Sequence, residues 1–139
     1  MAFRGPDSAT DPFLKGLQHA YAATLDRFVD LCMPDDGPAY IKRWGRQIID
    51  RAAPEAAIAL RRVNNEADIR AELPTIQHPT LIIHCEGDKI VPIDQARSLA
   101  KTLPKAELVV LRDSGHIPTM TRPLEIAREI ERFFAWLQP

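Results

Sequence analysis

The sequence has few cysteines, no excess of charge of either sign and no long hydrophobic run. Its two cysteines, Cys32 and Cys85, form no Cys-x-x-Cys pair, which argues against a disulfide framework and against a cysteine-based zinc site. Eighteen Lys and Arg residues against nineteen Asp and Glu residues leave a formal net charge of -1. A chain so balanced lacks the positive field that attracts nucleic acid, so we expect no nucleic acid partner and a reducing, cytoplasmic setting.

No stretch of the sequence indicates a membrane or export signal. The longest apolar runs span only a few residues, whereas a membrane-spanning helix needs about 20. Residues 1–10 lack the basic and then apolar stretches of a secretory signal, and we expect them to form a flexible amino terminus. Hydrophobic residues make up 45% and charged residues 27% of the 139 residues, which favours a globular chain with one core.

Prolines divide the first half of the chain into helical stretches. From Pro12 to Cys32 apolar residues recur at every third or fourth position, which predicts a single helix of about five turns. A second helix is expected over residues 39–52, and a third begins at Pro54, a favourable first helical position. Residues 11–75 are therefore predicted to form an all-helical segment.

The second half of the chain changes to short continuous apolar runs. Residues 80–84 and 107–111 are apolar and partly β-branched, as in strands that are buried on both faces of a parallel sheet. An amphipathic helix is expected between them, after Pro92, and another from Pro123 onward. Residues 76–139 are thus predicted to form a β-α-β-α unit of the α/β class.

Each predicted strand is followed by a loop with a side chain suited to proton transfer. Asp88 lies in the loop after the first strand, and His116 lies in the loop after the second. Because the carboxyl ends of parallel strands lie at one edge of a sheet, we expect the two residues to meet there. A carboxylate beside an imidazole fixes its tautomer and stabilises the imidazolium, so the pair is a candidate acid and base.

The residues around this pair resemble a known family. The stretch from Pro79-Thr80-Leu81 to Val91-Pro92, together with Gly115-His116, resembles the carboxyl-terminal part of the α/β-hydrolase fold family. The helical segment resembles the cap of its esterase-like members linked to nucleotide cyclases and transcription regulators, particularly over residues 61–70. The resemblance implies a helical cap over 11–75, followed by the carboxyl-terminal segment of the fold with an incomplete parallel sheet.

The resemblance also implies roles for the two site residues and a substrate class. Asp88 matches the acid and His116 the base of a Ser-Asp-His triad that hydrolyses small esters. The Gly-x-Ser-x-Gly turn that carries the serine of this family is absent, as is the glycine-rich oxyanion loop. None of the three serines, Ser8, Ser98 and Ser114, can be assigned as nucleophile. We therefore expect a member of this hydrolase lineage that is inactive alone; the alternative is a non-catalytic binding or regulatory module.

Two parallel strands would leave unpaired edges, which has consequences for partners. We expect either self-association into a homo-oligomer or dependence on the missing amino-terminal half of the fold. No cofactor is indicated by the sequence. His84 lies beside Cys85, but one adjacent pair supplies too few ligands for a metal, so no metal site is assigned.

Two further readings stay open at this point. Cys85, which stands where the family usually has Gly, could act as a nucleophile, although its position at a strand end favours a packed thiol. The aromatic residues Phe28, Tyr40 and Trp44 have helical spacing, so we expect them to fill the core, with an acyl pocket under the cap as the alternative.

Overall fold

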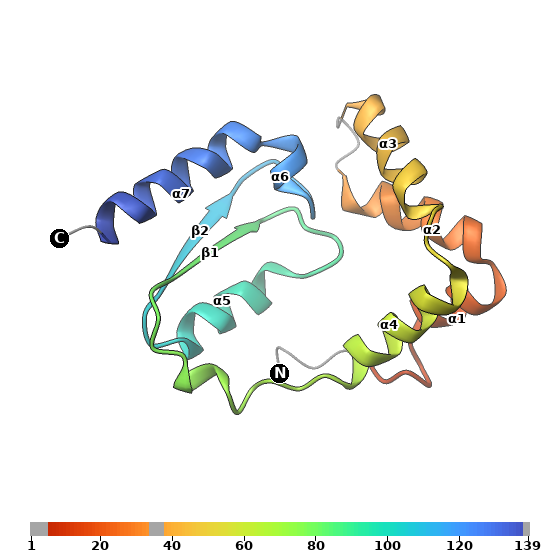
Figure 1. Cartoon of the computed structure of the whole chain (residues 1–139), viewed down its shortest axis with the longest axis horizontal. Coiled ribbons are helices and arrows are strands. Elements are labelled where there is room, and N and C mark those ends of the chain that lie inside the picture. Colours follow the sequence, from red (N-terminus) through yellow and green to blue (C-terminus); the bar gives the residue numbers. More distant parts are fainter. Residues whose placement is uncertain (1–5, 34–37, 138–139) are drawn as a thin grey trace.

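The computed structural model describes residues 6–33 and 38–137, which fold into two groups of elements. Figure 1 shows helices α1 to α4 gathered on one side and the β1-α5-β2-α6-α7 segment on the other. The elements are α1 (Pro12–His19), α2 (Tyr21–Cys32), α3 (Ala39–Ile49), α4 (Pro54–Glu66), the short 3-10 helix η1 (Leu73–Thr75), β1 (Thr80–Cys85), α5 (Ile93–Thr102), β2 (Ala106–Leu111), α6 (Pro118–Thr121) and α7 (Pro123–Leu137). No helix within these two ranges combines the length and the apolar character needed to cross a membrane.

The sheet consists of β1 and β2 in parallel, joined by the α5 crossover. The register runs from Thr80 opposite Ala106 to Cys85 opposite Leu111, so both strands end at the same level. The loops that follow β1 and β2 therefore leave the sheet at one edge. The predicted β-α-β-α order and the α/β class are confirmed, with the short α6 as an unpredicted addition.

The prediction that both strands are buried on both faces is wrong for this chain. Only the last residue of each strand, Cys85 and Leu111, is buried, and the other strand residues are partly or more fully exposed. Ile126 of α7 packs on these two residues together with Ile83 and Val109. Within the described residues each strand has a single strand neighbour, so the sheet is too narrow to enclose the side chains on its faces.

The single helix expected between Pro12 and Cys32 is broken at Ala20, where the backbone leaves the helical region. The break brings the rings of Phe13 and Phe28 to a centroid distance of 5.2 Å. In one straight helix the two residues would lie about 22 Å apart along the axis, because each residue adds about 1.5 Å. The spacing of apolar residues does not distinguish the two forms, since both place the same side chains on one face.

Gly16 allows the two halves of this helical hairpin to approach closely. A Cβ atom at Gly16 would lie 2.5 Å from the hydroxyl oxygen of Thr24, which is closer than any van der Waals contact. The Thr24 hydroxyl in turn donates to the carbonyl of Ala20, at the corner between α1 and α2. A larger residue than glycine at this position would require the Thr24 side chain or the helix that carries it to shift.

A buried carboxylate fixes α1 against α4. Asp11 caps α1 by accepting the N–H of Phe13 at 3.0 Å, and its other oxygen accepts from Arg61 at 2.7 Å and from Asn65 at 2.9 Å. We call Asp11, Arg61 and Asn65 the Asp11 cluster. Burial opposes the charge of Asp11, but the bonds from Arg61, Asn65 and Phe13 outweigh it and lower the pKa to about 2.

The expectation that the aromatic residues fill the core is wrong for two of the three. Tyr40 is 65% exposed and Trp44 is 48% exposed, because α3 packs on α2 through its opposite face. That face contributes Ile41, which is buried with Val29 and Met33. The surface that α3 presents to solvent is therefore partly aromatic.

Candidate active site

Asp88 follows β1 in a tight loop that fixes its carboxylate. Its Oδ1 atom accepts the backbone N–H groups of Ile90 at 2.8 Å and Val91 at 2.9 Å, the local pattern by which Asp stabilises a turn. The side chain is only 4% exposed. One carboxylate oxygen is thus engaged by the loop itself, and the other is directed toward the neighbouring loop.

His116 comes from that neighbouring loop, after β2. Its Nδ1 atom lies 2.9 Å from Oδ2 of Asp88, and its side chain is 31% exposed. The backbone N–H of His116 donates to the carbonyl of Cys32 at the end of α2, which ties the loop to the helical segment. The expected meeting of the two loops is what the structure shows; a catalytic role for Asp88 or His116 stays a prediction.

The electrostatics of this pair favour the charged form of the acid. Burial raises the pKa of Asp88, but the bonds from Val91, His116 and Ile90 outweigh it, so the pKa lies below its ordinary value. An ionised carboxylate can only accept, so the Nδ1 atom of a neutral His116 must carry its proton. The Nε2 atom is then a free acceptor, and it has no hydrogen-bond partner within residues 6–33 and 38–137.

His84 is a second histidine beside the acid that the sequence indicated only as a weak metal candidate. Its Nε2 atom lies 2.9 Å from the carbonyl of Val91 and 3.5 Å from Oδ2 of Asp88. It therefore braces the loop whose N–H groups hold Asp88. In the sequence, only its place near the end of a strand, four residues before Asp88, indicates that it lies beside the acid. In the described part of the chain, no three His, Cys, Asp or Glu side chains gather in a way that could hold a metal ion.

A close backbone contact fixes the two loops to each other. A Cβ atom at Gly87 would lie 3.0 Å from the carbonyl oxygen of Ser114, so a side chain here would press on the loop of His116. Asp113 begins that loop with a positive φ of 52°, and its carbonyl accepts from Arg122 at 2.8 Å. The loop that carries His116 is therefore held at several points along its backbone.

The hydrogen bonds of the three serines go to residues other than His116. Ser114 is buried, and its hydroxyl lies 3.0 Å from that of Thr121. Ser98 lies within α5, and Ser8 accepts from Asn65 of the Asp11 cluster at 3.4 Å. None of the three makes a hydrogen bond to His116 among the described residues, and none can be assigned as its nucleophile.

The structure supports the packed alternative for Cys85. The residue is 1% exposed at the end of β1. Burial raises the pKa of its thiol and the charge of Asp88 adds to the rise, whereas a hydrogen bond with Ser114 opposes it. A neutral buried thiol is a poor nucleophile. Cys32 is similar, because burial and the charge of Asp88 raise its pKa to about 11.

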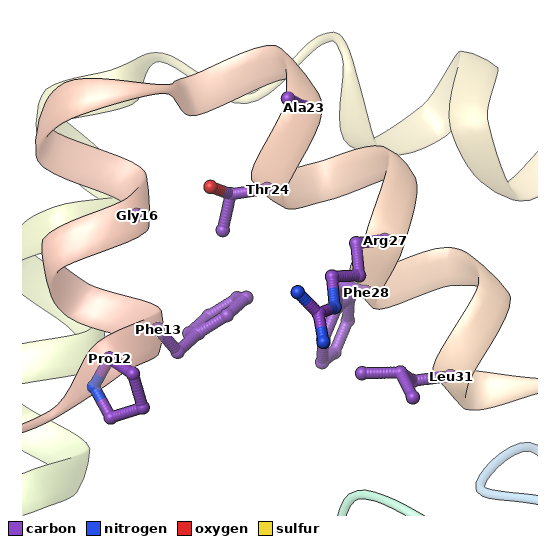
Figure 2. A pocket seen from close by; sticks show the side chains of 8 residues that line it. All are labelled: Pro12, Phe13, Gly16, Ala23, Thr24, Arg27, Phe28 and Leu31. Atoms are coloured by element: carbon purple, nitrogen blue, oxygen red, sulfur yellow. The ribbon is translucent and has the colours of Figure 1, made fainter.

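An open cavity of about 570 Å³ lies between α1 and α2. Figure 2 shows the side chains that turn toward it, among them the rings of Phe13 and Phe28. Phe28 is partly buried and lines this cavity, while its role in an acyl pocket stays a prediction. The residues that line the cavity are Pro12, Phe13, Gly16, Ala23, Thr24, Arg27, Phe28 and Leu31.

Comparisons with known proteins agree with the fold described above. A model of the α/β hydrolase fold matches residues 12–123. A pimeloyl-[acyl-carrier protein] methyl ester esterase of Nitrosomonas europaea is 32% identical over 121 residues, which cover 84% of this chain and 48% of the esterase. A protein of the same name from Aromatoleum aromaticum is 31% identical over 128 residues, which cover 89% of this chain and 51% of the relative. The chain spans about half the length of the curated relatives it matches.

Solved structures show the same fold. An esterase from Exiguobacterium antarcticum superposes with a TM-score of 0.85 at 18% identity, covering 95% of this chain and 52% of the esterase. The enol-lactonase from Burkholderia xenovorans gives a TM-score of 0.82 at 22% identity, covering 96% of this chain and 53% of the lactonase. At these identities the superpositions establish the arrangement of helices and strands.

Proposed function

The chain belongs to the α/β-hydrolase fold family, and from that premise we propose that it carries the acid and base of an esterase-type acyl hydrolase but is inactive alone. One observation carries the proposal. The Nδ1 atom of His116 lies 2.9 Å from Asp88, whose pKa is lowered, while the Nε2 atom has no partner among the described residues. This is the arrangement in which an imidazole accepts a proton from a nucleophile.

In the proposed reaction a serine from outside the described chain attacks the carbonyl of a small ester. The Nε2 atom of His116 accepts the serine proton, and Asp88 stabilises the resulting imidazolium. His116 then donates that proton to the leaving alcohol, which leaves an acyl-serine. Water, deprotonated by the same nitrogen, releases the carboxylic acid and regenerates the serine. The ester substrate is supported by the esterase names of the relatives.

The need for a partner is supported by the sequence and by the surface of the chain. The sequence contains no Gly-x-Ser-x-Gly turn, and no serine engages His116 in the described residues. We propose that a polypeptide with the amino-terminal half of the fold, including its serine, completes the site. Apolar side chains that a partner could cover stay exposed along α7, namely Leu124, Ile130, Phe134, Trp136 and Leu137.

Hydrolysis of p-nitrophenyl butyrate tests the proposal. The chain alone is expected to give no turnover above buffer, whereas mixing it with the amino-terminal half of an esterase relative is expected to restore turnover. The restored rate should fall at least about 1,000-fold in His116→Ala and in Asp88→Asn, the loss typical of triad members. Arg62→Gln, an exposed change on α4, is the control that should retain it. Turnover by the chain alone that His116→Ala abolishes would contradict inactivity.

A non-catalytic binding or regulatory module is the second candidate. It is favoured by the exposed aromatic residues of α3, Tyr40 and Trp44, which offer a surface for another protein. The reading frame upstream of the gene distinguishes the two. A frame that encodes a Gly-x-Ser-x-Gly turn favours the hydrolase, and failure of every complementation mixture with a folded partner favours the module.

A further inference from the structure

The cavity between α1 and α2 combines apolar walls with one cation. Its walls come from aromatic and aliphatic side chains, with Phe13 and Phe28 in ring contact at 5.2 Å. Its volume of about 570 Å³ lies in the range of small-molecule sites. Arg27 is the only charged residue among those that line it in the described chain. Such a lining fits a molecule with an apolar body and one negative group.

Arg27 has no carboxylate partner in the described part of the chain, although two acids lie on its own helix. Asp26 and Asp30 of α2 both accept from Arg46 of α3, at 2.9 Å and 2.8 Å. Arg27 makes no hydrogen bond or ion pair within residues 6–33 and 38–137. Figure 2 shows its side chain extending from α2 among the residues that line the cavity. Among the described residues, α2 thus presents to the pocket a cation that no carboxylate pairs with.

The cavity shares helix α2 with the backbone contact that holds the loop of the candidate active site. Leu31 lines one end of it, and the carbonyl of the following residue, Cys32, accepts the N–H of His116 at 2.9 Å. Arg27 lies one turn earlier on α2, about 6 Å back along the axis at about 1.5 Å per residue.

We propose that this cavity binds the chain of an ester that ends in a carboxylate, and that Arg27 binds that carboxylate. Only the ester group of this ligand depends on the proposed function; the carboxylate depends on the cavity and Arg27. A guanidinium matches a carboxylate with two parallel hydrogen bonds. With one cation on the lining, the pocket balances a single negative charge better than the nearly double charge of a phosphate monoester. Arg27 is then a specificity-determining residue that selects substrates with a distal acid.

Binding to the chain alone tests this without any turnover. Monomethyl adipate and methyl hexanoate have the same chain length and differ in the terminal carboxylate, so calorimetric titration of both isolates its contribution. Monomethyl adipate is expected to bind about tenfold more tightly. In Arg27→Gln the two should bind equally, with methyl hexanoate unchanged. Arg62→Gln, an exposed arginine outside the cavity, should keep the full preference.

Several results would overturn the assignment. Equal affinities of the two esters for the wild-type chain, or an undiminished preference in Arg27→Gln, would show that Arg27 does not bind the carboxylate. Tighter binding of hexyl phosphate than of monomethyl adipate would refute the carboxylate specificity. A preference for monomethyl adipate that depends on Arg27 supports the inference even if no complementation mixture hydrolyses esters. The binding test and the hydrolysis test can therefore fail independently.

Discussion

Two carboxylates in this chain have almost the same surroundings and different consequences. The side chains of Asp11 and Asp88 are 1% and 4% exposed, and both have a lowered pKa despite burial. Asp11 accepts one backbone N–H group with one oxygen and two side-chain donors with the other. Asp88 accepts two backbone N–H groups with one oxygen, and its other oxygen lies beside His116. The donors differ: Arg61 is always charged, whereas His116 can change its protonation and keeps a free nitrogen. A buried, ionised acid therefore marks a structural contact or a candidate catalytic one according to its partner.

The largest loss of stability is expected for Asp11→Ala, which removes the carboxylate with the structural contact. The change leaves Arg61 and Asn65 without their acceptor and removes the cap of α1. We expect the free energy of unfolding to fall by about 3 kcal/mol, less than for a fully buried pair because Arg61 is partly exposed. Urea unfolding at neutral pH measures it.

Asp26→Ala is the matched control for that loss. Asp26 also pairs with an arginine, Arg46, but its side chain is well exposed. Because exposed ion pairs contribute little, the cost is expected to be below about 0.5 kcal/mol. Equal losses for Asp11→Ala and Asp26→Ala would show that burial of the Asp11 cluster does not determine its contribution.

The second largest effect is expected in the pH dependence of stability, because protonation of Asp11 weakens the Asp11 cluster. The pKa of Asp11 falls from an ordinary value of 3.8 to about 2 on folding, so its ionised form stabilises the folded chain. This contribution, about 2 kcal/mol, is fully present above the unfolded pKa and is lost as the pH falls from about 5 to about 2. Unfolding free energies of the wild type and Asp11→Asn should converge over that range. Parallel curves would refute the assignment.

A smaller effect on stability, with a distinct signature, is expected for Asp88→Asn. The amide retains an acceptor for Ile90 and Val91 but loses the charge, so we expect a cost of about 1.5 kcal/mol. Its N–H group can donate to Nδ1 of His116, which favours the opposite tautomer. Nitrogen NMR of the imidazole should show the proton on Nδ1 in the wild type and on Nε2 in the variant. An unchanged tautomer would contradict the proposed role of Asp88.

The two carboxylates also differ in how far the sequence reveals them. Asp88 and His116 could be predicted to meet because each follows a recognisable apolar strand, and parallel strands end at one edge. Asp11 gave no such signal, since its partner Arg61 is 50 positions away on another helix. The capping preference of Asp before Pro12 is local, but the choice of a distant arginine depends on how α1 and α4 pack.

The remaining errors have the same physical origin. The break at Ala20 accompanies a close approach of Gly16 to Thr24, which helical spacing does not encode. Tyr40 and Trp44 have the spacing of core residues, but their exposure depends on which face of α3 meets α2. Periodicity predicts that an apolar face exists and leaves open what covers it.

The smallest change, Gly87→Ala, tests whether the candidate site depends on loop geometry as well as on its two side chains. The added Cβ would lie 3.0 Å from the carbonyl oxygen of Ser114, a backbone atom that moves only with the loop of His116. We expect a loss of about 1 kcal/mol and a longer Nδ1 to Oδ2 distance, detected as a weakened Nδ1–H signal. Gly45→Ala in α3 is the control: its Cβ would meet Met33 at an ordinary 3.5 Å, so helix propensity should raise stability by about 0.5 kcal/mol. If both variants stabilise the chain, the two loops adapt freely, and the pairing of Asp88 with His116 depends on their own hydrogen bond alone.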